Sequence, residues 1–127
     1  MDRERFEQLV IKAIESLPDE FLELLDNVDV VVEDYPTAEQ LEIEEVEDET
    51  LLLGLYEGIP QTMRSSFYGM VVPDKITIFQ KAIEAMASSD DEIEEQINKT
   101  IRHEIAHHFG SSEETLREIE GYDEEFQ

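Results

Sequence analysis

The feature that most constrains the fold of this chain is a row of isoleucines at every fourth position: Ile93, Ile97, Ile101 and Ile105. Side chains four residues apart lie on the same face of an α-helix, so the row predicts one long helix with a single apolar stripe. Ser89 or Asp90 can cap its N-terminus, and the helix is predicted to run to Phe109 and to end at Gly110.

The N-terminal third of the chain combines a helical pattern with an extended one. Residues 3–17 have apolar residues at helical spacing, and Pro18 is expected to end this helix. Asp19 can then cap a short helical turn over residues 21–25. The β-branched run at 28–32 predicts a strand.

The middle of the chain has shorter signals. Thr37 can cap a short helix, residues 44–50 predict a solvated loop, and the apolar residues 51–56 precede a turn predicted at 57–60. The remaining predicted elements are strands at 67–72 and 76–79 and helical pieces at 81–87 and 113–120. Helices and strands are therefore interspersed, which predicts an α+β fold with a small sheet.

The length of 127 residues suits one domain spanning residues 1–127. There is no cysteine, so disulfides and thiolate metal sites are excluded. The charged N-terminus is not followed by an apolar signal-peptide segment, and no run approaches the roughly 20 apolar residues that span a bilayer. We therefore expect a soluble cytoplasmic protein.

The net charge of −25, from 9 basic and 34 acidic residues, is the outstanding feature of the composition. Such a surface repels nucleic acid and anionic lipid, so neither is expected as a partner. The acids are spread along the whole chain, which favours a role in solubility or adaptation to a salty cytosol over a dedicated function. The functional alternative is a preference for cations or basic partners, such as basic peptides.

All three histidines lie near the end of the long predicted helix. His103 and His107 are four residues apart, so both imidazoles can reach one zinc ion at about 2.0–2.1 Å. On a wheel of roughly 100° per residue they flank one edge of the apolar stripe, whereas Glu104 points partly into it. Glu104 is thus placed to take a proton from a metal-bound water. His108 falls inside the stripe, which favours a packed or supporting histidine over a metal ligand.

The pattern His-Glu-x-x-His also occurs by chance on helices of proteins without metals, so its extension matters. Gly110 can take the left-handed conformation that reverses the chain and returns Glu113 toward the histidines as a third ligand. Glu113 could instead be one more surface acid. The other candidates for the third ligand are Glu114, Glu118 and Glu120.

Residues 103–113 resemble the His-Glu-x-x-His-x-x-Gly-x-x-(Asp/Glu/His) signature of minimal zincin-like metallopeptidases, a family of small bacterial proteins. Residues 53–60 and 73–79 are also similar to that family. The resemblance implies a pared-down zincin fold, in which a small mixed sheet packs against the active-site helix and a cleft lies between them. It further implies that strand 76–79 is the sheet edge along which an extended peptide lies.

By the same resemblance, His103, His107 and Glu113 are the zinc ligands and Glu104 is the general base. The function expected first is a zinc-dependent metallopeptidase that hydrolyses peptide bonds through a metal-bound water. Tyr56 or Tyr68 could steady the oxyanion, although core packing is the more common role of such aromatics. The alternatives are a catalytically inactive acidic binding module on a zincin fold, and an acidic partner-mimicking protein with incidental histidines.

Overall fold

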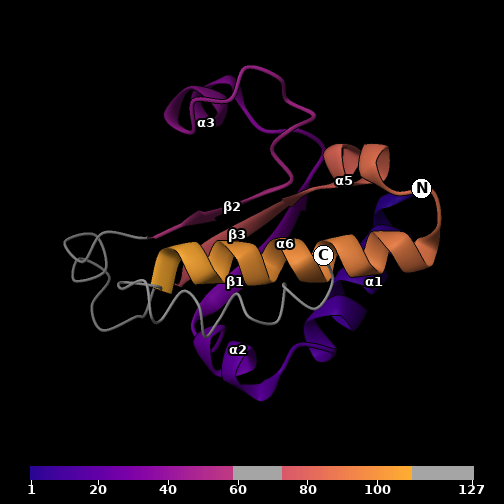
Figure 1. The fold of residues 1–127 in the computed structure, drawn as a ribbon, viewed down its shortest axis with the longest axis vertical. Helices are drawn as coiled ribbons and strands as arrows, with labels where there is room; N and C mark the ends of the chain where they lie inside the picture. Colours follow the sequence, from indigo (N-terminus) through magenta and orange to yellow (C-terminus); the bar gives the residue numbers. More distant parts are fainter. Residues whose placement is uncertain (59–72, 110–127) are drawn as a thin grey trace.

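The computed structural model describes residues 1–58 and 73–109 (Figure 1). Its elements in chain order are α1 (Arg3–Glu15), α2 (Asp19–Leu24), β1 (Val28–Glu33), α3 (Ala38–Ile43), β2 (Gly54–Glu57), β3 (Asp74–Phe79), α5 (Gln80–Met86) and α6 (Asp90–Phe109). The strand predicted at 67–72, the helix end at Gly110 and the helical piece at 113–120 lie outside the described residues. So do Tyr68 and every candidate for the third ligand.

The three strands form one mixed sheet in the order β1-β3-β2. β3 is parallel to β1 and antiparallel to β2, so Ile76 lies opposite Val30 on one side and Tyr56 on the other. The last four residues of β3 are all buried, as expected for a strand with neighbours on both sides. The prediction that 76–79 forms the sheet edge is therefore wrong, because β3 is central; among the described residues β2 lies at an edge.

The long helix α6 lies across the sheet and packs against α1, β2 and β3 (Figure 1). The predicted isoleucine stripe is buried along its whole length and meets Phe6, Leu9 and Val10 of α1 and Ile76 and Ile78 of β3 in one core cluster. The side-chain amide of Asn98 also donates to the carbonyl oxygen of Ala13 at 2.9 Å. The prediction of an α+β fold with a small mixed sheet against the long helix is confirmed.

Two of the predicted helix caps are present and one is displaced. Thr37 and Gln40 form a reciprocal capping box at the start of α3, and the Ser89 hydroxyl accepts from the backbone N–H of Glu92 at 3.2 Å. Asp19 is not the cap of α2: the carbonyl of Pro18 already accepts the first helical hydrogen bonds, so the helix begins one residue earlier than predicted. Asp19 instead places a carboxylate in the first turn, where the helix dipole favours it.

β2 and α6 approach each other closely at Gly54. A Cβ atom built on this glycine would lie 2.6 Å from the Thr100 Cγ2 and 3.2 Å from the backbone carbonyl oxygen of Thr77. The absence of a side chain at position 54 thus lets the edge strand lie directly on the helix that carries the histidines.

We expect Gly54→Ala to lower the free energy of unfolding by about 1–3 kcal/mol, because it overpacks this contact. Urea denaturation followed by circular dichroism measures the effect. Gly54→Ala combined with Thr100→Ser should recover part of the loss, since serine lacks the clashing methyl group, whereas the Thr77 carbonyl remains in place. Equal losses in the single and double variants would show that the methyl contact does not limit the approach.

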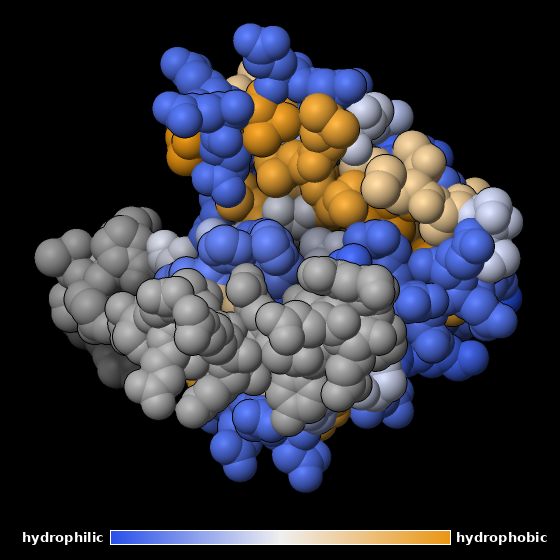
Figure 2. All heavy atoms as spheres, viewed as in Figure 1, coloured by the Kyte–Doolittle hydropathy of each residue, from blue (hydrophilic) through white to orange (hydrophobic). Residues whose placement is uncertain are grey.

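Figure 2 shows hydrophilic side chains over much of the visible face, with apolar side chains gathered in its upper part. Among the described residues, the large apolar side chains with the greatest exposure are Leu51, Ile43 and Met86. Within residues 1–58 and 73–109, no helix has both the length and the apolar character needed to cross a membrane.

Candidate active site

The C-terminal half of α6 brings His103 and His107 together on its exposed side. Their ring centroids are 4.3 Å apart and the rings are inclined at 64° to each other. The neighbouring residues Ile105 and Ala106 are fully buried, which fixes the rotation of the helix and directs both histidines to the margin of the core. This is the placement that the four-residue spacing predicts.

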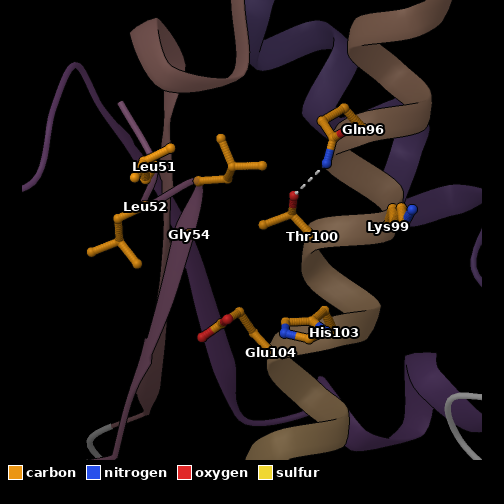
Figure 3. A pocket seen from close by; sticks show the side chains of 9 residues that line it. Leu51, Leu52, Gly54, Gln96, Lys99, Thr100, His103 and Glu104 are labelled. Atoms are coloured by element: carbon orange, nitrogen blue, oxygen red, sulfur yellow. Dashed lines mark hydrogen bonds between the residues drawn. The ribbon is translucent and has the colours of Figure 1, made fainter. Parts of the chain in front are cut away.

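Glu104 reaches from α6 toward the edge strand β2 (Figure 3). Its Oε1 accepts a hydrogen bond from the backbone N–H of Tyr56 at 3.0 Å. The carboxyl is half-buried, and burial raises its pKa above the ordinary value. The Tyr56 hydrogen bond opposes this rise in pKa, the charge of Glu44 adds to it, and His107 opposes it more weakly.

Glu104 lines two adjoining pockets. One has a volume of about 280 Å³ and lies between residues 51–54 and the α6 side chains that include Thr100 and His103. The other, of about 220 Å³, is lined by Glu44, Tyr56, His107 and His108 together with Glu104. The carboxylate is therefore located where the two pockets meet, with His103 in the first and His107 and His108 in the second.

Tyr56 links β2 to both neighbouring elements. Its hydroxyl donates to Asp74 Oδ2 at 2.8 Å, and its ring stacks on His108 with centroids 3.8 Å apart and planes inclined at 17°. His108 Nε2 lies 3.9 Å from the same Asp74 oxygen. Because the hydroxyl is directed at Asp74, the structure does not support Tyr56 as an oxyanion donor.

His108 is not buried in the apolar stripe as predicted, since 37% of its side chain is exposed. The last buried isoleucine of the stripe is Ile105, so His108 lies one turn beyond it and meets the face of Tyr56 instead of the core. His108 is thus a packed histidine, but it packs on Tyr56 and not within the core.

The two histidines fit part of a zinc site. Imidazole nitrogens from residues four apart are suitable donors for this ion, and a site able to do chemistry takes three protein ligands and a water. No group of three or more His, Cys, Asp or Glu side chains suited to a metal occurs within residues 1–58 and 73–109. Glu113 and the alternative candidates for a third ligand lie outside these ranges.

The contribution of β2 to the site was missed from the sequence. The signal available was the apolar run at 51–56, which was assigned no secondary structure. Among the described residues, the backbone N–H of Tyr56 on β2 is the only group seen to donate a hydrogen bond to Glu104. Almost every residue type carries a backbone N–H, so the sequence does not indicate which one donates to Glu104.

The raised pKa of Glu104 predicts a stability change in zinc-free protein. A carboxyl whose pKa is raised by folding stabilises the fold below its unfolded pKa, and this stability is lost as the pH rises through the folded pKa. Glu104→Gln should therefore be more stable than wild type at pH 7, with the difference vanishing below about pH 4. Thermal unfolding in the presence of a chelator measures this.

The matched control for this measurement is Glu95→Gln, an exposed position on the same helix. It removes the same charge from a very acidic protein, so any general relief of repulsion appears in both variants. A gain in melting temperature at pH 7 that is equal in the two variants would contradict an effect of burial at Glu104.

Comparison with known families bears on the same residues. A family model described as zincin-like metallopeptidase matches residues 25–122. The match begins before β1, includes the whole sheet and continues past the histidines of α6. No curated protein matches the chain.

Proposed function

Because this chain belongs to the zincin-like metallopeptidase family, we propose that it is a zinc-dependent peptidase with Glu104 as its general base. His103 and His107 are the proposed ligands from α6, and Glu113 is the proposed third ligand. Zinc in such a site acts as a Lewis acid and lowers the pKa of a bound water to about 7. The groups that accept and donate protons during the reaction have to be side chains of the protein.

The observation that carries this proposal is the position of the Glu104 carboxylate. It lies at the junction of the two pockets, beside both histidines, and one of its oxygens is held by the Tyr56 N–H. Glu104 would first accept a proton from the attacking water and then deliver it to the leaving amine.

The edge of β2 offers a place for the substrate main chain. The carbonyl of Leu53 accepts from the N–H of Phe79 on β3, whereas the N–H of Tyr56 is directed away from β3 toward Glu104. Backbone groups of an antiparallel pair alternate in direction, so the N–H and C=O groups of Gly54 also face the edge. An extended peptide paired with this edge would bring its carbonyl groups close to Glu104.

The test is to measure metal content and cleavage on the full chain. Protein equilibrated with zinc is expected to hold one ion per chain by native mass spectrometry. The same protein should cleave members of a random peptide mixture, lose this activity with a chelator and regain it with added zinc. Stoichiometric zinc without cleavage would favour the alternative, an inactive acidic binding module, and no bound zinc would refute the proposal.

A further inference from the structure

The pocket between β2 and α6 has a wall of three consecutive leucines, and we call it the leucine pocket. Residues 51–54 line one side, and Gln96, Lys99, Thr100 and His103 line the other, with Glu104 at one end (Figure 3). Gln96 and Thr100 are joined by a hydrogen bond of 3.4 Å along the helix. The pocket is continuous with the proposed catalytic site, because the base and one proposed ligand are part of its lining.

The size of the leucine pocket suits one amino-acid side chain. Its volume of about 280 Å³ falls below the roughly 300–1,000 Å³ of pockets that enclose whole small molecules. It lies beside the edge of β2, where side chains of a paired peptide would alternate in direction, with every second one turned to the same side. One such side chain can enter the pocket while the peptide main chain remains at the edge.

The polarity of the pocket differs from that of the whole protein. The chain carries a net charge of −25, which attracts basic peptides in general. The pocket, in contrast, has an aliphatic wall, and it has Lys99 as well as Glu104 in its lining. Leu51 is 69% exposed, so the apolar wall of the pocket extends to the protein surface.

We propose that the leucine pocket selects substrates with a large apolar side chain, such as leucine or phenylalanine, next to the peptide bond that is cleaved. This inference rests on the proposed peptidase function and adds the substrate class to it. A lysine side chain is disfavoured in the pocket because its ammonium group would lose water against the leucine wall, although the acidic surface attracts basic residues elsewhere in the same peptide.

The test uses a series of peptides that differ only at the residue entering the pocket: Leu, Phe, Ala and Lys. Cleavage of the Leu and Phe peptides should exceed that of the Ala peptide by at least about tenfold in kcat/KM, the scale on which an apolar pocket distinguishes methylene groups. The Lys peptide should be cleaved no better than the Ala peptide. Equal cleavage of all four would overturn the inference and leave the peptidase function intact.

Two pairs of variants locate the preference in the pocket. Leu51→Ser should reduce the Leu-over-Ala ratio, whereas Ile43→Ser, with a similar exposure of 68% but outside the lining, should not. Lys99→Glu should raise cleavage of the Lys peptide relative to the Leu peptide on the order of tenfold. Lys12→Glu makes the same charge change on α1 and should leave the ratio unaltered. Effects of equal size within either pair would contradict the assignment.

A binding measurement separates this inference from the proposed function. In Glu104→Gln protein, methyl NMR signals of Leu52 and Thr100 should shift on addition of the Leu peptide and not of the Ala peptide. Shifts without any cleavage by wild type would support the pocket and reject the peptidase. Cleavage by wild type without shifts specific to the Leu peptide would support the peptidase and reject the leucine pocket as the site of selection.

Discussion

Replacing Glu104 by glutamine is expected to lower kcat/KM for peptide cleavage by roughly 10²–10⁴-fold, the usual contribution of a general base. Glutamine has nearly the same shape and keeps an oxygen that can accept from the Tyr56 N–H, so the contact between α6 and β2 should persist. It cannot accept a proton from water at neutral pH. Zinc content should therefore stay at the wild-type level while turnover is lost.

Steady-state cleavage of a Leu peptide and metal analysis of the same samples measure both quantities. Glu95→Gln, exposed on the same helix, is the control and should retain both activity and zinc. Cleavage by Glu104→Gln within a few-fold of wild type would remove the carboxylate from the mechanism. Loss of zinc together with activity would instead show that Glu104 supports the metal site.

Replacing His107 by alanine is expected to weaken zinc binding by more than about 100-fold. Loss of an outer partner of a metal ligand typically costs 10–100-fold, and loss of a ligand itself costs more. The remaining donor of the pair, His103, can supply only one nitrogen from α6. Competition with a zinc-sensitive dye at pH 7 measures the affinity, and cleavage should fall with it.

His108→Ala provides the matched control, because it removes an adjacent exposed imidazole that stacks on Tyr56. It should retain one zinc per chain. Equal loss of zinc in His107→Ala and His108→Ala would contradict the assignment of His107, and not His108, as a zinc ligand. Retention of zinc by His107→Ala would reject the pair of ligands proposed on α6.

The helix that carries these residues could be predicted from the sequence because its signal is local. The isoleucine spacing determines which side of α6 is buried, and with it the positions of His103, Glu104 and His107 relative to the core. The same reasoning failed at His108, since a helical wheel extends the stripe past the point where the core ends. Periodicity gives the rotation of a helix but not the extent of what packs against it.

The order of the strands could not be predicted in the same way. β1 pairs with β3 although forty residues separate the two strands in the sequence, and β2 occupies the other side of β3. Composition identified 28–32 and 76–79 as strands, but pairing depends on contacts between distant segments that leave no periodic signal in either one. The prediction that 76–79 is the sheet edge was therefore wrong: among the described residues, β3 is the central strand and β2 is an edge strand.

The hydrogen bond from the Tyr56 N–H to Glu104 makes the position of the proposed base depend on strand register and not on a side chain. Substitutions at position 56 other than proline would keep this donor as long as β2 stays paired with β3 as it is. A slip of β2 by one residue would turn the N–H of Tyr56 toward β3, because backbone direction alternates along the strand. A change of residue type in β2 should consequently disturb the position of Glu104 far less than the insertion or deletion of a single residue in this strand.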